Sequence, residues 1–232
     1  IINCKKGPIH QLGIGVRADT EEIVSVLLNI GLNTHKLHGH MYDFTGKIGA
    51  NPYFRLHWSY DLPKMPTINA SASLRWTDMN MLDFGNNRLN LSFLNAKQEV
   101  YLSNIKWNRL DIKGGFRNEI IDIRNIRSTQ IIGNYDFDQL SNDFMSLFVD
   151  GRTDTFDDGY FPTRGVNAGV SYSWTFAGLP SKVNDFHMVH ADAKVVVSIF
   201  ERMAFIPSID FRFLLGDKVP VAYFNAIGGS LP

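Results

Sequence analysis

The sequence predicts an all-β protein whose antiparallel, up-and-down strands form a transmembrane β-barrel. Three observations predict this class. Several segments alternate strictly between apolar and polar side chains, some of them exceed the length of strands in soluble sheets, and aromatic residues gather toward the ends of the apolar faces. Helical periodicity is absent nearly throughout. The chain has 232 residues, a length that suits one large β-domain. We therefore expect a single β-barrel domain over residues 1–232.

The alternation is clearest in four segments. In residues 23–33, Val26 and Leu28 occupy one parity, while Ser25 and Asn29 occupy the other. Side chains of a strand point alternately to its two faces, so a period of two predicts a strand with one apolar face. The other three such segments are 44–60, 67–77 and 165–176.

The remaining strands are predicted from weaker alternation bounded by turn residues. They are 10–18, 87–95, 98–107, 109–121, 143–152, 187–200 and 204–215, which brings the expected number to about eleven. Within 44–60, Pro52 falls on the apolar parity and predicts a local weakening of the ladder or a bulge. The two longer links, 122–142 and 177–186, are predicted as surface loops.

Alternation alone does not say whether the apolar face meets a soluble core or lipid. A soluble β-sandwich or a lipocalin-like barrel would carry its charges outside. Strand length favours a membrane, because 44–60 exceeds the five or six residues usual in globular sheets, whereas a tilted membrane strand takes about 9 to 11. Aromatic residues at strand ends, such as Trp58, Tyr60, Tyr172 and Trp174, favour it too, since they suit the membrane interface.

In a membrane barrel the polar parity would line a wet lumen, where charges of both signs satisfy one another and water. We expect nine charged side chains to face this lumen: Lys47, Arg55, Arg75, Lys113, Arg117, Asp192, Lys194, Asp210 and Arg212. Asn167 is expected to point inward with them. Residues expected to point outward are Val26, Leu28, Trp58, Val170 and Val195.

Composition excludes several classes of protein and partner. The 23 basic residues balance the 23 acidic ones, so no overall charge favours nucleic acid as a partner. Mean hydropathy is -0.11, and no apolar run approaches the roughly 18 residues of a membrane helix. The single cysteine, Cys4, cannot form an internal disulfide. The partner expected from the alternating strands is outer-membrane lipid. A homo-oligomer is compatible with the same strands.

Short motifs along the chain resemble a known family. Residues 13–19, Gly-Ile-Gly-Val-Arg-Ala-Asp, are similar to the opening hairpin of the bacterial surface-antigen barrel domain, and residues 44–49 resemble its third strand. This is the superfamily of outer-membrane assembly and two-partner-secretion transporters. Its "FPTRG" signature, which precedes a strand, is the most specific match, and it falls on Tyr160, Phe161, Pro162, Thr163, Arg164 and Gly165.

Residues 220–229, which end in Gly228 and Gly229, resemble the start of the long loop that folds back into the lumen in this family. The resemblance implies sixteen strands and an outer-membrane location, so we expect this chain to lack the C-terminal strands. Within the superfamily, these sequence motifs are most similar to those of the barrel that follows patatin-like phospholipase domains in Bacteroidetes-type proteins. The turn motif has a plain structural interpretation as well, because proline and glycine are the usual turn residues.

Three functions follow as alternatives. The resemblance favours a barrel domain that anchors or exports an attached patatin-like phospholipase domain. A protein-assembly or secretion pore of the same superfamily is the second, and a soluble lipid- or ligand-binding β-barrel is the third. Periplasmic modules before the barrel would favour the pore, and a chain that folds in plain buffer would favour the soluble barrel.

No catalytic motif is found, and we expect no enzyme activity, cofactor or metal in this segment. A G-x-S-x-G nucleophile elbow is absent. His35, His38 and His40 form the one tight histidine cluster, but they lie in a predicted turn with only Asp43 as a nearby carboxylate. Zinc sites usually need three or four oriented ligands, so a solvated turn is favoured over a metal site.

Overall fold

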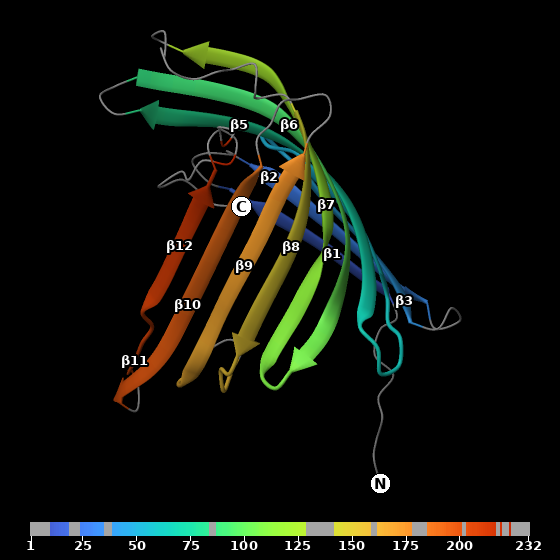
Figure 1. Ribbon diagram of the computed structural model, residues 1–232, viewed down its shortest axis with the longest axis vertical. Helices are drawn as coiled ribbons and strands as arrows, with labels where there is room; N and C mark the ends of the chain where they lie inside the picture. Colours follow the sequence, from blue (N-terminus) through green and yellow to red (C-terminus); the bar gives the residue numbers. More distant parts are fainter. Residues whose placement is uncertain are drawn as a thin grey trace.

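The computed structural model describes residues 10–18, 24–34, 39–83, 87–128, 142–158, 162–177, 185–200 and 203–216, together with Val219 and Tyr223. Within them it contains twelve β-strands (Figure 1). The strands are β1 His10–Arg17, β2 Ser25–Thr34, β3 His40–Ile48, β4 Tyr53–Tyr60, β5 Thr67–Asp83, β6 Asn87–Trp107, β7 Leu110–Ser128, β8 Asn142–Asp154, β9 Gly165–Ala177, β10 Phe186–Phe200, β11 Met203–Phe205 and β12 Ser208–Leu215. No helix long and apolar enough to cross a membrane is found in the described part of the chain.

All twelve strands belong to one antiparallel sheet, and from β1 to β11 each strand pairs with the next along the chain. β11 and β12 both pair with β10, and the Val195 amide donates to the Pro207 carbonyl between them at 3.1 Å. They are therefore two halves of one edge position, interrupted at a proline that cannot donate to a ladder. The predicted all-β, up-and-down class is confirmed, with eleven strand positions.

Three of the predicted boundaries between strands and connections are wrong. The segment 44–60 is a hairpin of β3 and β4, because the chain turns at 49–52 and pairs Lys47 with Tyr53. Conversely, the predicted strands 87–95 and 98–107 are one 21-residue strand, β6. β7 also continues to Ser128, into the predicted loop 122–142. Most of the predicted loop 177–186 lies outside the described residues.

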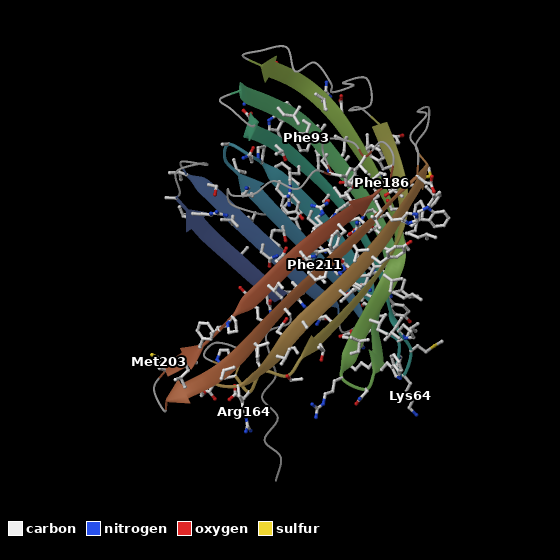
Figure 2. All side chains as sticks on the ribbon, turned by 60° about the vertical axis from the view of Figure 1, so that its left-hand side comes forward. Lys64, Phe93, Arg164, Phe186, Met203 and Phe211 are labelled. Atoms are coloured by element: carbon white, nitrogen blue, oxygen red, sulfur yellow. The ribbon has the colours of Figure 1, made fainter. Side chains whose placement is uncertain are left out.

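The sheet twists and coils so that the β1–β4 part curves toward the β8–β12 part (Figures 1 and 2). β1 and β12 are its two edges, and within the described residues each pairs on one side only. A right-handed strand twist produces this coiling in any long antiparallel sheet. The coil gives the sheet an interior, and the site described below lies on that side.

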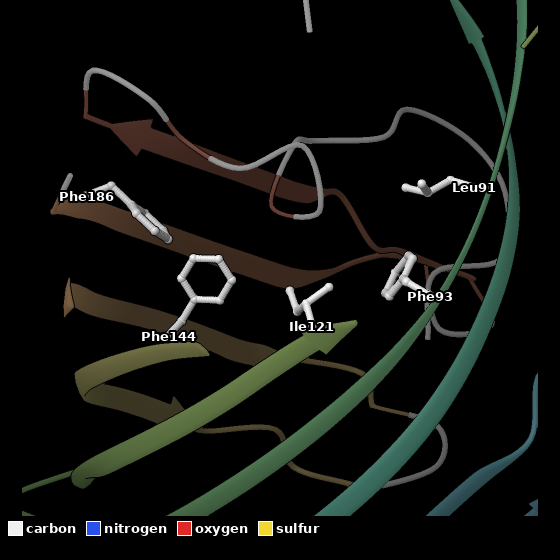
Figure 3. Close-up of a cluster of buried hydrophobic side chains, with 5 residues drawn as sticks. All are labelled: Leu91, Phe93, Ile121, Phe144 and Phe186. Atoms are coloured by element: carbon white, nitrogen blue, oxygen red, sulfur yellow. The ribbon is translucent and has the colours of Figure 1, made fainter. Parts of the chain in front are cut away.

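A compact apolar cluster fills part of the interior (Figure 3). It consists of Leu91, Phe93, Ile121, Phe144 and Phe186, whose exposed fractions range from 0% to 8%, with Ile123, Val219 and Tyr223 packed against it. Its members lie where β6, β8 and β10 begin and where β7 ends, which is one end of the sheet. The cluster was not predicted from the sequence.

Candidate functional site: the polar face and its basic hollow

The sheet has one apolar and one polar face. Val170 is 58% exposed and Val149 is 53% exposed on the apolar face, whereas their neighbours Gly169 and Phe148 are buried. Exposed apolar side chains recur on this face in nearly every strand: Leu12, Ile14, Val16, Val26, Ile48, Phe54, Leu56, Leu74, Val100, Leu102, Phe116, Leu147, Val195, Val197, Ile209, Phe211 and Phe213. These side chains form one continuous apolar surface across the sheet. Its area is far larger than that of the apolar patches that monomeric soluble proteins expose.

Aromatic clusters mark opposite ends of the apolar face. Where β3 begins and β4 ends, His40 stacks on Tyr60 at 4.4 Å between ring centroids and accepts a 3.1 Å hydrogen bond from Trp58 Nε1. Where β9 ends and β10 begins, His187 stacks on the Tyr172 ring, and its Nδ1 lies 2.8 Å from the Tyr172 hydroxyl. Because β3 and β9 run in the same direction, the two clusters lie at opposite ends of the sheet, as two interfacial girdles would.

The nine charged residues predicted for the polar parity are distributed over three places on the polar face. Arg55, Lys113 and Arg117 line one hollow, and the Arg75 guanidinium lies 4.9 Å above the adjacent Tyr53 ring. Lys47 lies on the next strand, β3, where it pairs across the sheet with Tyr53. The other four lie on β10 and β12: Asp192 pairs with Arg152 at 2.8 Å, Asp210 lies 2.9 Å from His190 Nε2, Arg212 donates to the Met188 sulfur, and Lys194 is exposed.

The hollow has a volume of about 220 Å³ and lies over β4 to β8. We call it the basic hollow; its lining residues are Tyr53, Arg55, Ser71, Ser73, Lys97, Glu99, Tyr101, Lys113, Arg117 and Phe148. Register explains why these residues meet. Ser71 pairs with Glu99, and Glu99 pairs in turn with Arg117, so a residue from each of β5, β6 and β7 falls in one row across the sheet.

Glu99 is the centre of an ionic network in the basic hollow. Its Oε1 accepts a 2.7 Å hydrogen bond from Arg117 Nε and lies 3.6 Å from Lys97 Nζ, while Oε2 accepts from Ser71 Oγ at 3.3 Å. Its side chain is only 12% exposed. Burying a charge costs desolvation energy, and only a well-formed ion pair offsets this cost. Glu99 therefore stabilises Lys97 and Arg117, the two cations that converge on it.

Aromatic rings fix the cations of the hollow in place. The Arg117 guanidinium lies 4.7 Å from the Phe148 ring centroid, and Lys113 Nζ lies 6.0 Å from that of Tyr101. Gly115 makes this possible, because a Cβ there would lie 2.4 Å from the Tyr101 Cβ. A bulkier residue at this position would displace Tyr101, so the glycine in β7 allows the ring to lie against the sheet.

Lys97, Glu99, Tyr53, Tyr101 and Phe148 are site residues that sequence reasoning missed. The predicted strand break fell at residues 96 and 97, and this removed Lys97 from any face. Gln98 interrupts the pattern close to this point, because it places a polar side chain on the apolar face. The apolar residues Leu94, Ala96 and Val100 on the other parity were the signal that would have placed Lys97 and Glu99 on the polar face.

The turn from β8 to β9 contains the described part of the predicted signature, residues 162–165; Tyr160, Phe161, Gly228 and Gly229 lie outside the described residues. The Asp157 carboxylate accepts hydrogen bonds from the amides of Thr163 and Arg164, at 2.9 and 3.2 Å, and from the Thr163 hydroxyl. Gly165 has φ of +123°, and a Cβ there would lie 2.4 Å from the Thr155 carbonyl oxygen. Only glycine fits such a position without strain.

These hydrogen bonds make the turn sensitive to acid. The Thr163 hydroxyl first, and then the Thr163 and Arg164 amides, lower the pKa of Asp157 to about 2. A depressed folded-state pKa means that the carboxylate supports the turn fully above its ordinary pKa of about 3.9, and this support is lost as pH falls toward 2. We expect the ¹³C-carboxyl shift of Asp157 to titrate near 2, and Thr163→Ala to move the midpoint toward 4. A wild-type midpoint near 4 would contradict the arrangement.

His40 is the only member of the predicted histidine cluster among the described residues, since His35 and His38 lie outside them. Its ring is engaged by Trp58 and Tyr60 on the apolar face. No group of three or more metal-ligating side chains is found in the described residues.

Comparison with known proteins now places the chain. No curated protein sequence matches it. A sequence profile of the OMP85 superfamily matches residues 56–230. The solved structure "The crystal structure of BamA from Haemophilus ducreyi lacking POTRA domains 1-3" is similar in fold, with a TM-score of 0.75 and 14% sequence identity. The match covers 97% of this chain and 45% of that chain, so this chain spans under half of the solved one.

The antiparallel sheet with opposite polar and apolar faces, together with the superfamily match, defines the class, which is an outer-membrane β-barrel protein. The chain belongs to the OMP85 superfamily, since the matched residues make up well over half of it. The predicted outer-membrane location and the predicted superfamily are thereby confirmed, and the soluble-barrel alternative is wrong. Barrel proteins of this superfamily are typically non-enzymatic proteins of assembly and transport.

Proposed function

We propose that this chain is the membrane part of a larger protein and anchors an attached patatin-like phospholipase domain at the outer membrane. The observation that carries the proposal is the pairing of an apolar outer face with a partly filled interior. The outer face would contact membrane lipid, because burying apolar side chains in lipid removes them from water. The polar face would line the barrel lumen, and with it the nine charged residues predicted there.

The interior favours anchoring over free passage. Phe144 and Phe186 pack against Tyr223 with ring centroids 5.4 and 5.0 Å apart, and the Tyr223 hydroxyl donates to Glu119 on β7. These contacts join Tyr223, which follows β12 in the chain, to the inner side of β7, β8 and β10. The apolar cluster and Tyr223 would narrow any path through the barrel lumen. A narrowed lumen suits an anchor better than a permanently open pore.

The patatin-like attachment is supported by the sequence motifs along the chain taken together, which within the superfamily are most similar to barrels of that kind. A protein-assembly or secretion pore is the second candidate. The basic hollow favours it, because a polar, charged wall with space beside it is what a moving polypeptide or solute would contact.

Deletion of the gene separates the two candidates. Loss of an anchor should release or abolish only the attached domain, and the abundance of other outer-membrane barrels should remain unchanged. Quantitative proteomics of purified outer membranes measures this. A general depletion of barrel proteins would overturn the anchor proposal in favour of the assembly pore. Fractionation of cells that carry the attached domain without this chain is the matched control, and it should place that domain outside the membrane fraction.

A further inference from the structure

The basic hollow holds more positive charge than its own carboxylates neutralise. Five cations, Arg55, Arg75, Lys97, Lys113 and Arg117, lie in it or at its edge. Three carboxylates are near enough to balance them: Glu99 lines the hollow, Asp150 pairs with Lys113 at 3.1 Å, and Glu119 lies next to Lys97. An excess of two positive charges therefore remains.

The carboxylates are already occupied by protein partners. Both Glu99 oxygens accept hydrogen bonds from Arg117 and Ser71. Glu119 accepts from Asn95 with Oε1 and from Tyr223 with Oε2. None of these groups is left over to neutralise Arg55, which forms no ion pair with another described residue.

The donors that remain converge on the same space. Arg117 uses only Nε in its bond to Glu99, and its stacking on Phe148 leaves the edge of the guanidinium, with its terminal nitrogens, free to donate. Arg55 pairs across the sheet with Ser73, and Ser73 pairs with Lys97, so two cations flank one hydroxyl. Guanidinium and ammonium groups with a nearby hydroxyl are the donors that tetrahedral oxyanions prefer.

We propose that the basic hollow binds the phosphate group of a ligand. A phosphate monoester carries about −1.5 to −2 charge at neutral pH and so matches the excess of two positive charges. The ligand would enter from the aqueous side, because the hollow lies on the polar face and the apolar face points away from it. This site goes beyond the anchoring proposed above and does not depend on it.

The test is titration of inorganic phosphate into the full-length protein in detergent, followed by calorimetry. We expect saturable binding that Arg55→Gln weakens about tenfold or more, which is the loss of one charge-assisted hydrogen bond. Arg55→Lys should retain part of the affinity, because it keeps the charge. Lys194→Gln, which removes a cation from the same face on β10 outside the hollow, is the matched control and should leave binding unchanged.

Two outcomes would overturn the proposal. One is the absence of saturable binding in the wild type. The other is an equal loss in Arg55→Gln and Lys194→Gln, since it would show only general attraction of an anion to a charged surface. A second titration with short-chain phosphatidic acid identifies the source of the phosphate. Arg55-dependent binding of that lipid, tighter than that of inorganic phosphate, would assign the site to a lipid headgroup, and the reverse order would assign it to a soluble ligand.

Discussion

Phe144→Ala should lower the free energy of unfolding by about 3 to 5 kcal/mol, the usual loss when a fully buried aromatic ring leaves a cavity. Phe144 is 0% exposed and contacts the rings of both Phe186 and Tyr223. The variant therefore removes the ring that joins the sheet to Tyr223. Urea unfolding of the full-length protein in lipid vesicles, followed by tryptophan fluorescence, measures the loss.

Phe211→Ala is the matched control for this variant. It removes the same ring from β12, but Phe211 is 43% exposed on the apolar face and encloses no cavity. We expect a clearly smaller loss of stability. Equal losses in the two variants would show that the interior cluster contributes no more than the outer surface does, and this would contradict the packing described for it.

Val170→Arg should cost about 2 to 4 kcal/mol of folding free energy in a bilayer, the penalty for a charge on the lipid face near the membrane midplane. Val170 lies near the middle of β9 and is 58% exposed on the apolar face. The penalty arises because lipid cannot solvate the guanidinium. Folding into vesicles across a urea series, followed by gel mobility, measures it.

Ser171→Arg is the control, since it places the same charge one residue along β9 and on the opposite face. A guanidinium on the polar side can meet water, so the expected loss is well below that of Val170→Arg. If Ser171→Arg costs as much as Val170→Arg or more, the assignment of the two faces to lipid and interior is wrong.

The sequence alone was sufficient for the class of fold, because alternation persists over most of each strand whatever its neighbours are. The same regularity caused the error at 44–60. Register pairs Phe44 with Leu56 and Lys47 with Tyr53, so even-numbered residues remain on one face through the turn. An uninterrupted period of two therefore conceals the hairpin, whose turn is marked in the sequence only by Gly49, Asn51 and Pro52.

The basic hollow was beyond prediction for a different reason. Alternation predicts which face a side chain occupies, but not which strand positions lie side by side. Arg55 and Phe148 meet at one hollow only through the registers of four successive strand pairs. The apolar cluster was missed similarly, since Phe93 and Phe186 are apolar residues on a face expected to be polar.

Spin labels at Val170 and Ser171 test the central claim most directly. Each label is attached to a single cysteine in a Cys4→Ser background, and the full-length protein is reconstituted in bilayers. Its collision rates with oxygen and with a water-soluble nickel complex are then compared. We predict that the label at 170 collides mainly with oxygen, as in lipid, and that the label at 171 collides mainly with the nickel complex or is shielded from both reagents. Preference for the nickel complex at 170 and for oxygen at 171 would contradict an apolar face in lipid.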